Sequence, residues 1–482
     1  MTRTHRLVSP ASCLLLIVPL LLSSGGCSGR DSSGPADRVF LGGAVYTVDA
    51  ERSWAAAVAI RDGAIVYVGD DAGAEALIGP ATTVTRLEGR MLLPGFNDSH
   101  CHLSAGGFLH VHCNLAGLAD LGEITGRLSN CAESPDAGED AWVLGGGWEI
   151  LAFPDISPHR SILDDIYPNR PVYLNSIDGH SAWVNSEALR RAGIDRDTPD
   201  PPQGIIERDA KTGEPSGTLR DAAITLVEDV IPAPSIEERS QWIEAGMRIA
   251  HSYGITSVIE PGVNETMLEP YAALDRAGRL GLRVLASLSP IGWHPGALDD
   301  SIDELLAGRE RFRTPNLDVD SVKVYIDGVI EHGTGVLLEP YLGRGDDRGE
   351  PFHSQERLDD IVTRLDGDGL QIHIHAIGAR AVRMALDAFT VARETNGRKD
   401  TRHHIVHLQM IHPDDAPRFG KLGVAATFQA LWAWPEPWVT DLAVPMIGEE
   451  RAERMYPIGC VHWTGGRIVG GSDWFVSSLN AL

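Results

Sequence analysis

Residues 91–107 read MLLPGFNDSHCHLSAGG and place His100 and His102 where a short apolar run passes into small residues. In an extended strand, side chains two residues apart lie on the same face, so both imidazoles can converge on one point. The pattern is compatible with a metal site, and equally with two partly buried histidines that have ordinary backbone partners. The rest of the chain has to decide between these interpretations.

Downstream of this stretch, short apolar runs alternate with helical patterns. Seven runs are expected to be strands of strand–helix units: RPVYLNS (170–176), GITSVIE (254–260), LRVLASL (282–288), SVKVYID (321–327), LQIHIHA (370–376), HHIVHL (403–408) and GRIVGGSD (466–473). Such alternation indicates a parallel sheet, and in an α/β chain of 482 residues a (β/α)8 barrel over residues 93–482. Residues 37–92 alternate like short antiparallel strands, with Asp62-Gly63 as a tight turn, and predict a small β-domain.

The first 27 residues have the pattern of an export signal. MTRTHR is positively charged, and ASCLLLIVPLLLSSGG follows with an apolar core too short for a stable membrane-spanning helix. Cys27 comes directly after Ser24-Gly25-Gly26, which resembles the lipobox of bacterial lipoproteins, although Ser24 stands where Leu is usual. We expect export with a lipid anchor on Cys27, the alternative being plain secretion, and a flexible tether over residues 28–36.

Charge and cysteine content narrow the function further. A formal net charge of -26 argues against a nucleic-acid partner, because a phosphate backbone would be repelled. Cys113 and Cys131 flank one helical pattern and are candidates for a disulfide in an exported protein. Cys101 lies between the two histidines and should point to the opposite face of the strand, so a thiol nucleophile at this position is not expected.

Further polar residues occupy the later predicted strands. His375 ends LQIHIHA and shares its face with His373, while His407 and Asp473 stand at the ends of HHIVHL and GRIVGGSD. Each has an ordinary explanation as a bonded core histidine or a turn residue, but Lys323 within SVKVYID would bury a costly ammonium unless it is neutralised or paired. Because barrel strands all end at one face, we expect these residues to share a site.

In this order, PGFNDSHCHL, VKVYIDG, HIHAIG, IVHLQ and GGSDW resemble the amidohydrolase superfamily, and within it amidohydrolase family 3, the YtcJ-like group. The likeness runs from about residue 38 to the last residue. It implies a metal-dependent hydrolase with a TIM-like barrel beside a small composite β-sandwich. Ala379, His404 and Val406 stand where the group often has Asp, Arg and Glu, and these differences bear on specificity more than on metal binding.

The resemblance also implies roles for the strand-end residues. His100 and His102 would hold one divalent metal together with Asp473, which would also transfer protons. A second metal would bind His375 and His407, and a carboxylated Lys323 would bridge the two. The donors suit zinc, as one or two ions per chain. The residues expected to bind substrate are His180 in DGHSAW, Trp148, Asp327 and Gln429.

The predicted activity is hydrolysis of a non-peptide carbon–nitrogen bond of a small molecule by a metal-activated water. One alternative is an esterase, lactonase or phosphoesterase on the same barrel, because fold and metal do not fix the bond that is cleaved. Another is a lipid-anchored protein with a structural metal. Lys323 and Asp473 argue against this alternative, because structural metal sites favour Cys and His ligands. Since the chain ends soon after Asp473, we also expect the eighth helix and the remaining sandwich strands to be missing, which would leave apolar surface uncovered.

Overall fold

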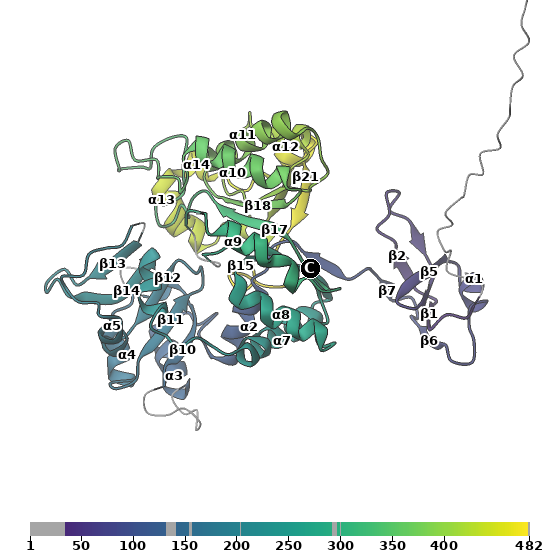
Figure 1. Cartoon of the computed structure of the whole chain (residues 1–482), viewed down its shortest axis with the longest axis horizontal. Coiled ribbons are helices and arrows are strands. Elements are labelled where there is room, and N and C mark those ends of the chain that lie inside the picture. The colour runs from purple at the N-terminus through teal and green to yellow at the C-terminus, as the bar shows by residue number, and fades with distance from the viewer. Residues whose placement is uncertain are drawn as a thin grey trace, which may run out of the picture. The chain divides into compact units, whose positions relative to one another are not determined.

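The computed structural model describes residues 34–131, 141–153, 157–202, 204–291, 296–298 and 300–480. The chain divides into two compact units, Met1–Pro94 and Gly95–Leu482, and Figure 1 labels many of their elements. The expected signal segment with Cys27 and most of the tether lie outside the described residues. Within the described ranges, no helix combines the length and the apolar character needed to cross a membrane.

The first unit contains two small sheets. Strands β1 (Arg38–Leu41), β4 (Ala57–Arg61), β5 (Ala64–Gly69) and β6 (Thr83–Arg86) form one sheet, and β2 (Ala44–Tyr46), β3 (Trp54–Ala55) and β7 (Met91–Leu92) form the other, with the short helix α1 (Asp71–Glu75). Asp62 and Gly63 have φ values of 49° and 72° and make the predicted tight turn between β4 and β5. The expectation of purely antiparallel strands is wrong, because β1 pairs with β6, and β2 with β7, in parallel.

The second unit is built on an eight-stranded parallel sheet that confirms the barrel prediction. In chain order and in spatial order its strands are β8 (Phe96–Asp98), β15 (Ile255–Val263), β16 (Arg283–Leu288), β17 (Leu317–Tyr325), β18 (Gln371–Ala376), β19 (His404–His407), β20 (Ala425–Phe428) and β21 (Arg467–Gly470). Hydrogen bonds join the first and last strands just beyond their ends, from Ser99 N to Gly470 O at 3.2 Å and from Asp473 N to His100 O at 2.7 Å. The barrel seam therefore brings His100 beside Asp473.

Helices surround this sheet: α2 (Leu103–Val111), α7 (Ile236–Ser252), α8 (Glu265–Arg276), α9 (Ile302–Gly308), α10 (Gln355–Gly367), α11 (Ala379–Asn396), α12 (Ala416–Leu422) and α15 (Ile458–Trp463). Helix α7 begins with a capping box between Ser235 and Glu238. A Cβ on Gly107 of α2 would overlap the carbonyl of Trp242 in α7, so glycine is required where the two helices meet. Because α2 starts directly after His102, this close packing helps to fix the His102 backbone.

A second sheet is inserted between β8 and β15. Its strands are β9 (Cys113–Asn114), β10 (Val143–Trp148), β11 (Val172–Ser176), β12 (Ser181–Val184), β13 (Gly204–Arg208) and β14 (Pro215–Asp221), in the order β13-β14-β12-β11-β10-β9. The prediction that residues 170–176 form a barrel strand is wrong, since β11 belongs here. Every residue of β11 is buried, as in a barrel strand, so the sequence pattern does not separate the two cases.

Helices α3 (Leu121–Cys131), α4 (Arg160–Ile166), α5 (Ser186–Ala192) and α6 (Thr225–Glu228) accompany the inserted sheet. A disulfide joins Cys113 of β9 to Cys131 at the end of α3, as the sequence suggested. Short helices fill several loops: η1 (Ile150–Ala152), η3 (Ala222–Ile224), η4 (Arg309–Phe312), η5 (Ala430–Trp432), η6 (Trp438–Ala443), α13 (Val444–Ile447) and α14 (Glu449–Ala452).

Candidate metal centre and its cavity

One cavity at the carboxyl ends of the barrel strands gathers all six residues predicted as metal ligands. Its lining includes His100, His102, Lys323, His375, His407 and Asp473. These side chains come from strands or strand ends that are up to 373 residues apart in the chain, from His100 after β8 to Asp473 after β21. The barrel geometry therefore brings together what the sequence pattern proposed.

His100, His102 and Asp473 form a compact group of donors. Asp473 Oδ1 lies 3.0 Å from His100 Nε2 and 3.3 Å from His102 Nε2, and one ligand atom from each residue falls within 4.8 Å of the others. His100 Nε2 and Asp473 Oδ1 are buried and face each other without forming a hydrogen bond, and neither atom has another hydrogen-bond partner in the described part of the chain. Because unsatisfied buried polar atoms are costly, this arrangement fits a bound cation.

The protonation states of this group also suit a cation. Burial by itself raises the pKa of Asp473, but the imidazoles of His100 and His102 beside it hold that pKa well below its usual value. Burial, together with the charge of Lys323, lowers the pKa of His100 well below its usual value. An ionised carboxylate beside a neutral imidazole is the combination that ligates a divalent metal.

His375 and His407 lie side by side in the same cavity, with ring centroids 4.6 Å apart. His375 Nδ1 is 3.3 Å from Asp327 Oδ1, and His407 Nδ1 is 3.1 Å from Gln429 Oε1. In both residues the Nδ1 atom therefore faces a supporting oxygen, and Nε2 is the nitrogen left for a ligand. Among the described residues, His100, His102 and Asp473 form the one group of three or more His, Cys, Asp or Glu side chains whose ligand atoms all lie within 4.8 Å of one another.

Asp327 and Gln429, predicted to bind substrate, lie behind the histidines and are not among the residues that line the cavity. Asp327 also accepts hydrogen bonds from the backbone N–H groups of Val336, Ile377 and Gly378, at 2.8–3.0 Å. A carboxylate held in this way fixes the ring orientation of its histidine partner. Asp327 and Gln429 are therefore placed to orient His375 and His407, which corrects the assignment to the substrate side.

Lys323 reaches the cavity from β17, and only 1% of its surface is exposed. Burial lowers the pKa of its amine to about 7, although the charge of Asp473 acts in the opposite direction. Its Nζ lies 4.8 Å from the centre of the Tyr325 ring, and no ion pair of Lys323 occurs among the described residues. The buried lysine that the sequence singled out thus remains without a carboxylate partner in that part of the chain.

His373 is a residue that the predicted site lacked. Its Nε2 lies 2.7 Å from His100 Nδ1, and its ring is 4.0 Å from that of His404, whose Nδ1 is 3.1 Å from Thr427 Oγ1. This buried row of side chains supports the His100 ring from the barrel interior. The sequence did contain the signal, since His373 shares a strand face with His375.

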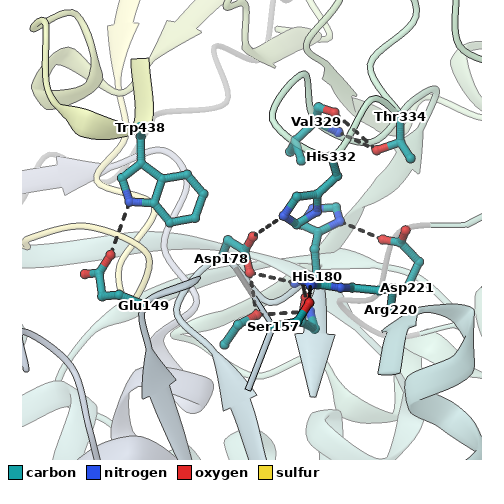
Figure 2. A network of polar contacts seen from close by, with 12 residues as sticks. Glu149, Ser157, Asp178, His180, Arg220, Asp221, Val329, His332, Thr334 and Trp438 are labelled. Carbon is teal, nitrogen blue, oxygen red and sulfur yellow. Dashed lines mark hydrogen bonds and ion pairs between the residues drawn. The ribbon is translucent and has the colours of Figure 1, made fainter. Parts of the chain in front are cut away.

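The inserted sheet supplies another wall of the cavity through Asp178, Gly179 and His180. His180, expected to bind substrate, therefore lines the cavity. Asp178, which was not predicted as a site residue, lines it as well. Figure 2 shows Asp178 and His180 together with His332 and Asp221; His332 Nε2 is 3.3 Å from Asp178 Oδ2.

Trp148 occupies a different position from the one expected. It is fully buried, packs edge-on against Phe153 and Trp183, and donates from Nε1 to Leu174 O at 2.8 Å. It is absent from the residues that line the cavity. Its large apolar ring fills the interior beside the inserted sheet, so Trp148 is a core residue there.

The rest of the lining is Tyr325 together with the apolar side chains of Val329, Ile377, Trp432, Phe475 and Val476. The Trp432 ring stacks on that of His407, with centroids 5.5 Å apart and planes inclined by 9°. Cys101 is fully buried in the barrel core, and burial raises the pKa of its thiol well above the usual value. This agrees with the expectation that Cys101 is not a nucleophile.

Comparison with known proteins gives consistent matches. A model of the amidohydrolase family matches residues 84–482. The protein LONG AFTER FAR-RED 3 of Arabidopsis thaliana is 31% identical, over 93% of this chain and 76% of its own. An N-substituted formamide deformylase of Arthrobacter pascens is 27% identical, over 80% of this chain and 72% of its own. The solved structure of an uncharacterized metal-dependent hydrolase from Pyrococcus furiosus has a TM-score of 0.70 and 25% identity, covering 92% of this chain and 86% of that chain.

Proposed function

The chain belongs to the amidohydrolase family, and from this premise we propose that it hydrolyses a non-peptide carbon–nitrogen bond of a small molecule in a metal-dependent reaction. One observation carries the proposal. His100, His102 and Asp473 bring three ligand atoms within 4.8 Å of one another, and buried atoms of two of them have no protein partner in the described chain.

The donor set favours zinc, as one or two ions per chain, because it combines imidazole nitrogens with a carboxylate. His100, His102 and Asp473 would hold the first ion, and His375 and His407 would hold a second. A divalent metal in this position supplies a water that ionises near neutral pH and polarises the scissile carbonyl.

Asp473 is the residue that we assign to proton transfer. Its carboxylate lies between His100 and His102 in the candidate metal group, so it would be placed to accept a proton from the attacking water and deliver it to the leaving nitrogen. His375 and His407 keep fixed ring orientations through Asp327 and Gln429, and the apolar wall around Trp432 and Phe475 limits the access of bulk water.

For Lys323 we propose carboxylation. Its neutral amine would add to carbon dioxide and lose one proton, giving a carbamate anion in place of a buried cation. The support is its position within the cavity and its burial, which favours the uncharged amine that reacts. As an anion in the same cavity, the carbamate would supply oxygen ligands for the metal.

The relative that deformylates N-substituted formamides makes this class the first substrate to test. The panel consists of N-substituted formamides, N-acyl amino acids, cyclic amides, lactones and a phosphate ester, each assayed with and without a chelator. We expect chelator-sensitive release of amine from at least one amide and recovery of activity on adding zinc. Turnover confined to lactones or phosphate esters, or unaffected by metal removal, would contradict the proposal.

We further propose that the protein is exported and carries a lipid on Cys27. The support is the charged and apolar signal pattern before Cys27. Mass spectrometry of the mature N-terminus, with Cys27→Ser as the comparison, tests this proposal. An unmodified terminus that begins after a cleavage site elsewhere would contradict it.

A further inference from the structure

His180 is held at the cavity wall by groups of the inserted sheet. Its Nδ1 lies 2.9 Å from Asp221 Oδ1, and its backbone N–H donates to Asp178 Oδ1 at 3.1 Å (Figure 2). The backbone N–H of Asp221 in turn donates to His180 O at 3.0 Å. Three contacts therefore fix both the backbone and the ring of this one residue.

The register of the inserted sheet explains why these groups meet. Antiparallel strands β12 and β14 pair Ser181 with Arg220, which places the preceding His180 opposite the following Asp221. Arg220 is itself held by Glu207 and by the hydroxyls of Ser157 and Ser181. The His180–Asp221 pair is thus anchored to a bonded framework, and not to a free loop.

The contact with Asp221 determines which nitrogen of His180 serves the cavity. Nδ1–H donates to the carboxylate, so Nε2 is the ring atom left to face the cavity that His180 lines. Among the residues that the structure describes, no protein group pairs with Nε2. This nitrogen is positioned for a ligand.

The surrounding charges make Nε2 a donor. Burial alone lowers the pKa of His180, but the hydrogen bond and charge of Asp221, with the charges of Asp178 and Glu331, raise it above its usual value. The imidazolium form carries a proton on both nitrogens. His180 lines the same cavity as His375, one of the proposed metal ligands.

We infer that His180, oriented by Asp221, donates a hydrogen bond from Nε2 to the carbonyl oxygen of the scissile bond and stabilises the negative charge that develops there. This inference rests on the proposed function, and it assigns His180 a direct role in catalysis with Asp221 as its positioning residue. The barrel wall would then provide the attacking water, and the inserted sheet would stabilise the oxyanion.

The charge of the site favours a carbonyl over a carboxylate on the substrate as the partner of Nε2. Asp221 pairs with the His180 ring, and the Asp178 carboxylate lies against the His180 backbone N–H. A substrate carboxylate would meet these anions in its ground state. A carbonyl is neutral on binding and becomes negative only in the transition state, where stabilisation accelerates the reaction.

The test compares three variants of the metal-loaded full-length protein: His180→Gln, Asp221→Asn and the matched control His159→Gln. His159 lies in the same inserted region, where its Nδ1 contacts Ser161 at the start of α4, and it is not among the cavity-lining residues. Rates are measured on N-benzylformamide and on the fastest amide of the panel.

We expect His180→Gln to lower kcat by about 10²- to 10³-fold with a much smaller change in KM, as for loss of one oxyanion donor. Asp221→Asn should lower kcat less, and should also lower the pKa of His180 measured by ¹⁵N NMR, an effect that a purely structural role would not produce. His159→Gln should remain within about twofold of the wild type, as for surface changes away from the site. A normal kcat in His180→Gln, with an active wild type, overturns this inference alone.

A binding experiment that does not need turnover separates the proposed hydrolysis from the proposed role of His180. Acetohydroxamate is titrated into the metal-loaded protein while the ¹⁵Nε2 resonance of His180 is followed. We expect the resonance to shift on binding, and the Kd to rise at least tenfold in His180→Gln. If no panel compound is hydrolysed, the proposed function fails, and the acetohydroxamate titration alone tests the role of His180. Absence of binding, or binding that leaves both the resonance and the Kd unchanged, overturns the role of His180.

Discussion

The cavity has two polar walls that differ in whether their polar atoms have hydrogen-bond partners. On the barrel wall, His100 Nε2 and Asp473 Oδ1 lie close together with no hydrogen-bond partner in the described chain. On the wall from the inserted sheet, His180 and Asp221 meet in a bonded pair at 2.9 Å. The first arrangement is costly for the protein alone and is relieved by a cation, whereas the second is already satisfied and serves to orient one donor.

The difference separates two kinds of mutational effect. A change on the barrel wall should alter the metal content, because those atoms are the proposed ligands. A change on the inserted sheet should alter the rate or the stability and leave the metal in place. Metal content and turnover, measured on the same variants, therefore distinguish the two walls.

The largest effect is expected for His100→Gln. Removing a group that only supports a metal ligand typically weakens metal binding by about 10- to 100-fold. Loss of the His100 imidazole should weaken metal binding by more than this and should abolish turnover. Competitive chelation gives the affinity, and thermal unfolding checks that the fold survives. His180→Gln is the matched control and should keep its metal. Equal metal loss in both variants would contradict the assignment of metal binding to the barrel wall alone.

A smaller effect is expected for Asp473→Asn, which keeps an oxygen for the metal but removes the base. Turnover should fall by about 10²- to 10⁴-fold, the range for lost acid–base catalysis. Elemental analysis should find much of the metal still bound. A variant with near-normal kcat would remove Asp473 from proton transfer.

The barrel wall was the part that the sequence could predict. Proposed ligands such as His375 and His407 lie at the ends of apolar strands, and parallel barrel strands all end at one face, so local pattern and fold class together place them in one cavity. His373 was visible in the same strand but needed the 2.7 Å contact with His100 to acquire a role.

The inserted sheet could not be predicted in the same way. Strand β11 is buried throughout and imitates a barrel strand, and Asp221 reaches His180 only through the β12–β14 register across 41 residues of chain. Trp148 was expected to bind substrate, yet its indole fills the core beside Phe153. The positions of β11, Asp221 and Trp148 depend on long-range strand pairing and packing, which the local sequence pattern does not reveal.

The disulfide offers a way to weaken the inserted sheet alone. Cys113 and Cys131 are 18 residues apart, and a loop of this size corresponds to about 3 kcal/mol of stabilisation in the chain-entropy model. The double variant Cys113→Ser/Cys131→Ser should therefore unfold earlier in urea. Its affinity for metal should match that of the wild type, because both cysteines lie outside the metal centre. A parallel loss of metal would show that the barrel wall depends on the inserted sheet.

The smallest effect concerns Glu187 on α5 of the inserted region. Its carboxylate accepts hydrogen bonds from Arg190 and Arg191 at 2.7–2.8 Å, and these bonds, Arg190 first, lower its pKa from 4.5 to about 2. Because the folded pKa lies below the unfolded one, the stabilisation is complete above about pH 4.5 and is lost as the pH falls toward 2. Arg190 is 70% exposed, so solvent screening limits the gain to about 0.2–1 kcal/mol.

Glu187→Gln should therefore lower the free energy of unfolding by less than about 1 kcal/mol at pH 7, and by less still at pH 3. Urea titrations at both pH values measure the difference. A double-mutant cycle with Arg190→Gln isolates the pair, and 1 M salt should reduce the coupling because the Debye length falls to about 3 Å. Metal affinity and kcat should not change in any of these variants. A coupling that grows at low pH would contradict the lowered pKa of Glu187, and a change in kcat would show that the surface of α5 communicates with the His180 wall.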